Sequence, residues 1–279
     1  AIDFLKALNL GLKQRHPTAM LIAEDSTSYP GVTEPVWKGG LGFDYKWDLG
    51  WMHDTLEYFQ TGPEYRSRDY HKLTFSMMYY YNDDFLLPLS HDEVVHGKAT
   101  IAQKMYGEYE EKFPQARAFY MYMYAHPGKK LNFMGNEIGQ LREWDEKREQ
   151  DWGILKYPIH DAFHHFMQKL NHLYMTTPAL SAKDYENAGF QWLDCHQEGR
   201  VIYAMQRMAG DQTVIGVFNF SAQPQNGYAV PLQKDGSYRE LLNSDWECFG
   251  GSKKREELVY ENGCVLDLLP FSAVLLVNG

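Results

Sequence analysis

Cysteine is scarce in this sequence of 279 residues. Its three cysteines, Cys195, Cys248 and Cys264, are an odd number and lack the spacing of a metal site. A secreted framework of disulfides would need paired cysteines in larger number. We therefore expect buried free thiols in a reducing compartment, and a cytoplasmic protein.

Basic residues are also few. Lysine and arginine number 27 against 37 aspartates and glutamates, which gives a net charge of −10. Nucleic acids and anionic membranes attract positively charged surfaces, so neither is expected as a partner. No apolar run approaches the roughly 18 residues that a membrane-spanning helix needs. The first six residues have no signal-peptide layout and no initiator methionine, and they have the pattern of a helix interior. We expect the chain to begin inside a longer protein.

Several functional motifs are missing. The sequence has no phosphate-binding P-loop, no dinucleotide fingerprint and no Gly-x-Ser-x-Gly nucleophile elbow. Its histidines do not match a metalloprotease spacing: His91 and His96 are five residues apart, and His160, His164 and His165 lie near one predicted helix. We expect no metal and no cofactor.

The first part of the chain alternates between two hydrophobic periods. Helical spacing predicts helices at 2–15, 51–59, 71–81, 116–125 and 163–174. Short apolar runs predict strands at 19–23, 42–47, 85–90 and 131–134. Alternating strands and helices indicate βα units around a parallel sheet. Four such strands would be half of an eight-stranded barrel.

The pattern changes after Pro178. Short β-type runs occur at 190–193, 201–205, 214–218 and 273–277, without a long helical segment between them. Turn signals lie at Glu198–Gly199, Gly210–Asp211 and Asp235–Gly236. This pattern is typical of an antiparallel all-β domain. We therefore predict an α/β unit over residues 1–178 and an all-β domain over residues 179–279.

Polar residues follow three of the predicted strands. They are the pairs Glu24–Asp25, His91–Asp92 and Asn136–Glu137. The carboxyl ends of parallel strands meet at one edge, which carries the active site in a βα barrel. The same edge binds ligands in a doubly wound sheet. A candidate site at this edge is therefore expected under either architecture.

Glu24 is the first candidate catalytic residue. A glutamate at a strand end is commonly solvated or paired in an ion pair, and that reading stays open. A tyrosine- and tryptophan-rich segment follows Glu24, however. Apolar rings beside a carboxyl group disfavour its charged form and raise its pKa, as a general acid requires.

Asp92 is the second candidate. Its side chain could simply cap the next helix. Alternatively, the carboxylate could stabilise a developing oxocarbenium ion while the adjacent His91 binds sugar hydroxyls. Two carboxyl groups flanking the scissile bond are what glycoside chemistry generally requires.

Five stretches carry a specific family resemblance. They are AEDSTSYPGVT, GGLGFDYKWDLGWMHDTLEYF, LPLSHDEVVHGK, AHPGKKLNFMGNEIGQ and REWD. In this order they closely resemble the 1,4-α-glucan branching enzymes of the α-amylase superfamily. The resemblance is dense from residue 2 to residue 174 and weaker in the all-β part. The long His-Asp stretch resembles branching enzymes more than ordinary amylases, whose signature there is shorter.

The resemblance implies the second half of a (β/α)₈ TIM barrel, followed by a C-terminal β-sandwich. It implies that Glu24 is the general acid/base and that Asp92 stabilises the transition state. His91 would bind substrate. The implied partner is an α-glucan such as glycogen, amylose or amylopectin, without a cofactor.

One part of the family pattern is missing. The family's nucleophilic aspartate lies in an Arg-x-Asp-Ala-Val type motif, and this sequence contains no such motif. Asp3 lies in a helical pattern and is no substitute. By the resemblance, the N-terminal module and the first half of the barrel are absent, and the chain alone is expected to be inactive. Two alternatives remain: an α-glucan hydrolase of the same superfamily, and a non-catalytic glucan-binding fragment.

Overall fold

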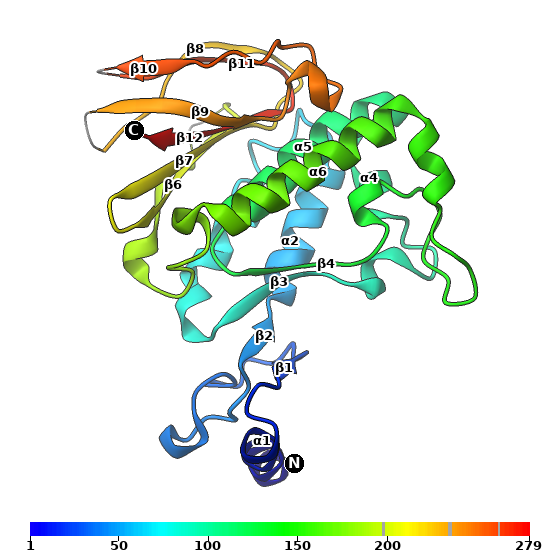
Figure 1. Cartoon of the computed structure of the whole chain (residues 1–279), viewed down its shortest axis with the longest axis vertical. Coiled ribbons are helices and arrows are strands. Elements are labelled where there is room, and N and C mark those ends of the chain that lie inside the picture. Colours follow the sequence, from blue (N-terminus) through cyan, green and yellow to red (C-terminus); the bar gives the residue numbers. More distant parts are fainter. Residues whose placement is uncertain (197–198, 234–235, 262) are drawn as a thin grey trace.

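A small parallel sheet and its helices form the first part of the chain. The computed structural model describes residues 1–196, 199–233, 236–261 and 263–279 (Figure 1). The elements of the first part, in chain order, are α1 (Ile2–Arg15), β1 (Ile22–Ala23), β2 (Tyr45–Trp47), α2 (Leu49–Gln60), α3 (His71–Thr74), β3 (Phe85–Leu89), α4 (Ile101–Lys104), α5 (Tyr109–Ala125), β4 (Lys129–Asn132) and α6 (Pro158–Thr176).

The strands of this sheet pair in chain order, β1-β2-β3-β4, and all neighbours are parallel. Ala23 pairs with Lys46, and Lys46 pairs in turn with Phe85. The parallel sheet expected from the alternating pattern is therefore confirmed. Sequential order is what one half of a closed barrel would contribute.

The segment 71–81 differs from its prediction as a single helix. It forms α3 and then two 3₁₀ turns, Phe75–Met78 and Tyr80–Asn82. The Tyr79 hydroxyl donates to Asp48 at 2.7 Å, whereas Tyr80 is fully buried against the rings of Phe85 and Tyr185. Two adjacent tyrosines thus reach different partners, and these tertiary contacts override the local helical pattern.

The second part is all β, as predicted. Its strands are β5 (Phe190–Asp194), β6 (Ile202–Ala209), β7 (Gln212–Asn219), β8 (Gln225–Ala229), β9 (Ser237–Asn243), β10 (Val259–Glu261), β11 (Val265–Leu268) and β12 (Ser272–Asn278). They form a six-stranded antiparallel sheet, β10-β9-β12-β7-β6-β5, and a two-stranded sheet, β11-β8. The turn predicted at Gly210–Asp211 is confirmed. Glu198 and Asp235, in the other two predicted turns, lie outside the described residues.

The central strands of the larger sheet, β6, β7 and β12, are buried on both faces. On one face, Ile202, Val217 and Leu276 pack with residues of the smaller sheet such as Tyr228 and Leu266. The residues between them point to the opposite face and pack on the helices. Successive side chains of a strand point to opposite faces, so the residues of each apolar strand contribute alternately to two hydrophobic cores.

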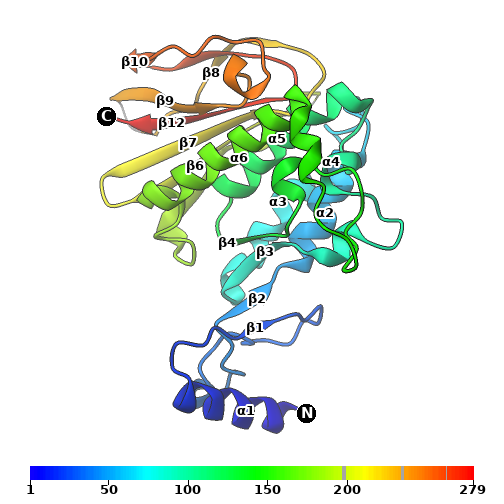
Figure 2. The same cartoon turned by 45° about the vertical axis from the view of Figure 1, so that its right-hand side comes forward.

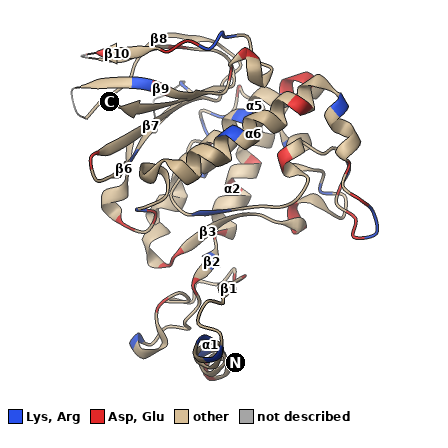
Figure 3. Cartoon of the chain, viewed as in Figure 1, with Lys and Arg blue, Asp and Glu red and all other residues tan. Residues whose placement is uncertain are grey.

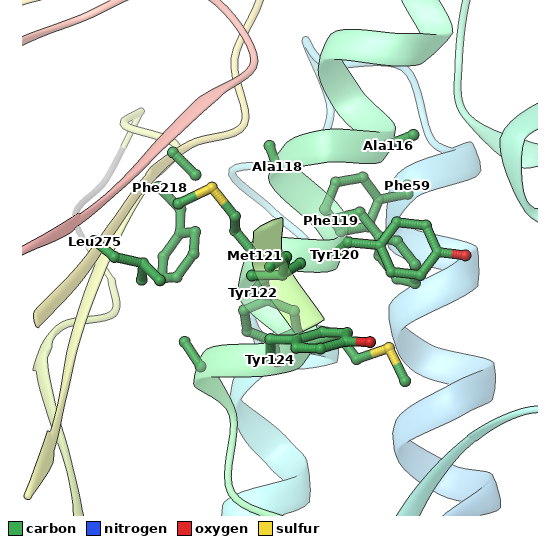
Figure 4. Close-up of a cluster of buried hydrophobic side chains, with 14 of the residues drawn as sticks. Phe59, Ala116, Ala118, Phe119, Tyr120, Met121, Tyr122, Tyr124, Phe218 and Leu275 are labelled. Atoms are coloured by element: carbon green, nitrogen blue, oxygen red, sulfur yellow. The ribbon is translucent and has the colours of Figure 1, made fainter. Parts of the chain in front are cut away.

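Helices α5 and α6 lie between the parallel sheet and the six-stranded sheet in both views (Figures 1 and 2). Figure 4 shows Phe218 and Leu275 approaching α5 from the β strands, with Phe59 of α2 on its other side. All residues from Gln115 to Ala125 in α5 are buried. A helix buried all round needs apolar residues on every side, which explains the uninterrupted apolar and aromatic run at 118–125.

Three fully buried arginines donate hydrogen bonds across the seam, which is the interface between the α/β part and the all-β part. Arg66 donates to the carbonyl of Phe220 at 2.8 Å, and Arg117 donates to the carbonyl of Ser244 at 2.6 Å. Arg207 of β6 donates in the opposite direction, to the carbonyl of Ala125 at 3.0 Å. Burial lowers the pKa of Arg66 and of Arg117 to about 10, so both remain charged at neutral pH.

Asp184 anchors the same seam. Its carboxylate accepts from Arg207 at 2.6 Å and from Lys129 of β4 at 2.8 Å. Figure 3 shows the blue stretch that Lys129 and Lys130 give to β4. Burial raises the pKa of Asp184, but Lys130 and Arg207 outweigh burial and lower the net pKa. The ionised carboxylate therefore stabilises the fold.

Two observations bear on the predicted environment of the chain. The three cysteines are free, but only Cys264 is buried, and Cys248 is exposed. The prediction that all three would be buried is wrong, since Cys248 falls in a surface 3₁₀ turn. Within the described residues, no helix has the length and apolar character to cross a membrane.

Replacing Asp184 should weaken the seam strongly. In Asp184→Asn, Arg207 and Lys129 lose their carboxylate, and breaking a buried ion pair in this way typically costs about 3–5 kcal/mol. The contribution of Asp184 should also fade in acid, as the pH falls from the aspartate's unfolded-state pKa through its lower folded-state pKa. Urea unfolding at several pH values measures both effects. Asp161→Asn, in a half-exposed pair with His165, is the control and should change stability by less than about 1 kcal/mol. Equal effects of the two substitutions would contradict the seam assignment.

Candidate active site

The candidate residues lie at the carboxyl edge of the parallel sheet. Glu24 follows β1 directly, whereas His91 and Asp92 follow β3. Strand β2 lies between β1 and β3, so the two carboxylates come from strands separated by one neighbour. The structure places all three predicted site residues on this edge and brings His91 and Asp92 into direct contact.

Glu24 and Asp25 have different roles in the structure. Asp25 pairs with the buried Lys46 of β2 at 3.0 Å and accepts hydrogen bonds from Thr27. Burial raises the pKa of Asp25, but the bonds from Lys46 and Thr27 outweigh burial and lower the net pKa. Glu24 is exposed and has no hydrogen bond or ion pair to any described residue. The structure thus uses the second acid to join β1 to β2 and leaves the first unengaged.

Two of the aromatic residues that follow Glu24 lie in different surroundings. Tyr29 packs with Ala23, Val32 and Leu41 in a small apolar cluster. Trp37 is 80% exposed in a 3₁₀ turn. Tyr29 and Trp47, which follow in sequence, line the cavity beside the strand end together with Asp25, and the apolar environment of Glu24 stays a prediction.

Ser90 and Glu93 cap the turn that carries Asp92. The Ser90 hydroxyl oxygen accepts from the Asp92 amide at 3.2 Å. The buried Glu93 carboxylate accepts from the Ser90 amide at 2.6 Å and from its hydroxyl at 2.8 Å. This reciprocal arrangement is a capping box. The alternative that Asp92 is the cap is therefore wrong, and its side chain is free for another role.

His91 and Asp92 form a half-exposed pair. The imidazole Nε2 lies 3.4 Å from the Asp92 carboxylate, and about half of each side chain is exposed. The His91 ring also packs against Phe133 and Trp144, with ring centroids 5.9 Å apart in each case. Aromatic packing thus holds the His91 ring, and the Asp92 carboxylate remains about half exposed to solvent.

The third predicted polar pair, after β4, is engaged locally. The Glu137 carboxylate accepts from the Gly135 amide at 2.8 Å, and the side chain of Asn136 donates to Asn132 at 3.2 Å. These contacts shape the turn after β4. Both residues therefore have a local structural role in this turn.

A cavity of about 830 Å³ opens beside this edge. Its lining comes from the loop after β1, the start of α2 and the segment before β3, and includes Tyr29, Lys46, Asp48, His53 and Tyr79. Burial raises the pKa of Asp48 to about 6, and its Oδ2 atom has no partner among the described residues. Sequence analysis missed Asp48, because its signal as the N-cap of α2 is purely structural.

Known proteins share the fold and the sequence of this chain. Residues 192–278 match the family model of the α-amylase C-terminal all-beta domain. The α-amylase of Geobacillus thermoleovorans, complexed with acarbose, aligns with 99% of the chain and 57% of its own length, at a TM-score of 0.65 and 15% identity. AmyP in complex with maltose aligns with 99% of the chain and 61% of its own length, at a TM-score of 0.71 and 13% identity. These likenesses show the fold.

Sequence relatives are closer. A 1,4-alpha-glucan branching enzyme GlgB from Oleidesulfovibrio alaskensis is 46% identical over 253 residues, which are 90% of this chain and 40% of that protein. The GlgB of Pseudomonas aeruginosa is 43% identical over 287 residues, covering 99% of this chain and 39% of that protein. This chain is a relative of the 1,4-α-glucan branching enzymes. It spans about two fifths of the length of these relatives.

The relationship to branching enzymes confirms the family resemblance of the sequence motifs. It also confirms the order of the fold, an α/β portion followed by an α-amylase-type all-β domain.

The capping box makes a prediction about Ser90 and Asp92. Ser90→Ala removes the oxygen that accepts from the Asp92 amide and should cost about 0.5–2 kcal/mol of stability. Asp92→Asn removes no described hydrogen bond of the cap and should change stability by less than about 0.5 kcal/mol. Urea unfolding of both variants measures the difference. The reverse order of effects would return the capping role to Asp92.

Proposed function

We propose that this chain carries the acid/base half of an α-glucan branching enzyme. The observation that supports it best is the position of Glu24 and Asp92 at one edge of a parallel sheet. The Glu24 side chain makes no described hydrogen bond or ion pair, and the Asp92 side chain contacts only His91. The sequence identity to 1,4-alpha-glucan branching enzymes supports an α-glucan as the substrate.

The proposed reaction cleaves an α-1,4 glucan and reattaches the released chain through an α-1,6 bond. Glu24 protonates the leaving glycosidic oxygen and later accepts the proton of the incoming 6-hydroxyl. Asp92 stabilises the positive charge that develops on the sugar ring, and His91 binds hydroxyls of the same sugar. Both roles suit the half-exposed geometry of the pair.

A retaining reaction of this type also needs a nucleophile, about 5–5.5 Å from the acid/base. The sequence contains no Arg-x-Asp-Ala-Val type motif. We therefore assign the nucleophile to polypeptide outside these 279 residues, where it would complete a (β/α)₈ barrel with β1 to β4. No cofactor or metal enters this mechanism.

The proposal extends to organisation and location. We place the boundary between the half-barrel, residues 1–178, and the all-β domain, residues 179–279, at the turn after α6. The substrate is an α-glucan such as glycogen, amylose or amylopectin. The three free cysteines support a cytoplasmic location.

Glu24→Gln tests the acid/base role in the natural polypeptide that contains this chain. General acid/base catalysis contributes about 10²–10⁴-fold in rate, so branching of amylose should fall by this factor while glucan binding persists. Asp92→Asn should cause a comparable loss. Glu34→Gln, an exposed glutamate in the loop after Glu24, is the matched control and should retain activity. Near wild-type turnover by Glu24→Gln would remove Glu24 from the mechanism.

Residues 1–279 alone should form no new α-1,6 linkages, because they lack the proposed nucleophile. An assay of amylose with this polypeptide, followed by debranching and chain-length analysis, measures the product directly. Branching by the isolated chain would overturn the assignment of the nucleophile. With the natural polypeptide, new reducing ends without α-1,6 branches would favour the hydrolase alternative. Glucan binding without either product would favour the non-catalytic alternative.

A further inference from the structure

Two sequence motifs close to His91 contact each other in the structure. The first is the loop after β3, residues 93–99, and the second is the REWD segment, residues 142–145, in the connection after β4. The Trp144 amide donates to the Val94 carbonyl at 3.0 Å. The Glu143 carboxylate accepts from the amides of Gly97 at 3.0 Å and Ala99 at 2.8 Å.

The first of these loops has an unfavourable backbone. His96 and Ala99 have φ angles of 59° and 64°, in a region that residues other than glycine rarely adopt. Such conformations persist when surrounding contacts impose them. Glu143 supplies two of these contacts, one through each carboxylate oxygen. Lys104 supplies three more, by donating to the carbonyls of Glu93, Lys98 and Ala99.

The same contacts reach the candidate site. Glu143 precedes Trp144, whose ring meets the His91 ring edge to face, with centroids 5.9 Å apart. Phe133 packs against both rings, with its centroid 5.2 Å from that of Trp144. The loop after β3 and the segment after β4 therefore form one unit, with His91 packed against its aromatic side.

We infer that Glu143 is a positioning residue for His91: by binding the amides of Gly97 and Ala99, it holds Trp144 where the indole fixes the imidazole. This inference rests on the proposed role of His91 in glucan binding. The amides of Gly97 and Ala99 hold the pKa of Glu143 below its usual range. Glu143 is thus ionised at neutral pH, with both of its oxygens able to accept.

Glu143→Gln tests the contact itself. A glutamine has one acceptor oxygen, and its amide nitrogen would face a backbone N–H, so one of the two bonds is lost. Hydrogen exchange followed by mass spectrometry should show faster exchange in peptides that cover residues 95–100. Glu146→Gln, at an exposed glutamate directly after the REWD segment without a described side-chain contact, should exchange like the wild type. Unchanged exchange in Glu143→Gln would overturn the inference at this step.

Kinetics then test whether the contact acts through His91. In the natural polypeptide, Glu143→Gln should lower kcat about tenfold, a loss of about 1.4 kcal/mol of transition-state stabilisation. In a His91→Ala background the same substitution should have no further effect, because residues that act through one another are not additive. Multiplicative losses would overturn the positioning role.

Ala99→Gly provides a rescue that a general loss of stability would not show. Glycine adopts a positive φ at little cost, so the loop should keep its shape with fewer supporting bonds. Ala99→Gly added to Glu143→Gln should therefore restore much of kcat, and failure to restore it in a folded protein would count against the inference. Wild-type turnover by His91→Ala alone would instead remove the proposed role of His91, while the exchange experiment would still report on the loop contact.

Discussion

The buried seam around α5 is the constraint on which the rest of the structure depends. A six-stranded sheet packs on one side of this helix and α2 on another, so α5 has almost no solvent-facing side. Three charged residues are buried in this seam, and each donates to a carbonyl of the other part of the chain: Arg66, Arg117 and Arg207. Buried charges tolerate little displacement, because each lost partner leaves an uncompensated cation. The seam thereby joins the α/β part to the all-β part and supports β3, which His91 and Asp92 follow.

The candidate site shows a repeated division of roles between neighbouring polar residues. After β1, Asp25 joins the strand to Lys46 of β2, and Glu24 is left without a described bond. After β3, Ser90 and Glu93 close the capping box, and Asp92 is left half-exposed beside His91. In each case the structural residue satisfies the backbone or the strand pairing. The adjacent carboxylate, Glu24 or Asp92, makes no described hydrogen bond to the backbone or to a neighbouring strand.

Much of the fold followed from hydrophobic periodicity alone. Helices α1, α2, α5 and α6 were predictable from a period of 3.6. The parallel strands were predictable from short apolar runs, although β4 (Lys129–Asn132) overlaps its predicted range 131–134 only in part. The apolar runs at 190–193, 201–205, 214–218 and 273–277 predicted four strands of the all-β part. Three of these strands, β6, β7 and β12, are buried on both faces, which explains why their sequences are mostly apolar. Strands β8 to β11 were missed because they expose many of their residues. The segment 71–81 was assigned as one helix because the separate partners of Tyr79 and Tyr80 are tertiary contacts that no local pattern reveals.

By itself, the sequence determined the class of the chain and placed Glu24, His91 and Asp92 at the carboxyl edge of the sheet, because polar residues that follow apolar strands can be recognised in the sequence. Their roles in a site stay predictions. Only the tertiary structure decided which of these polar residues are structural. It showed that Ser90, and not Asp92, caps the turn, that Asp25 pairs with Lys46, and that Glu24 is exposed. It also joined Glu143 to Gly97 and Ala99 across more than forty residues of chain. Contacts between distant loops depend on how the strands beneath them are arranged, and that arrangement is set by packing across the whole seam.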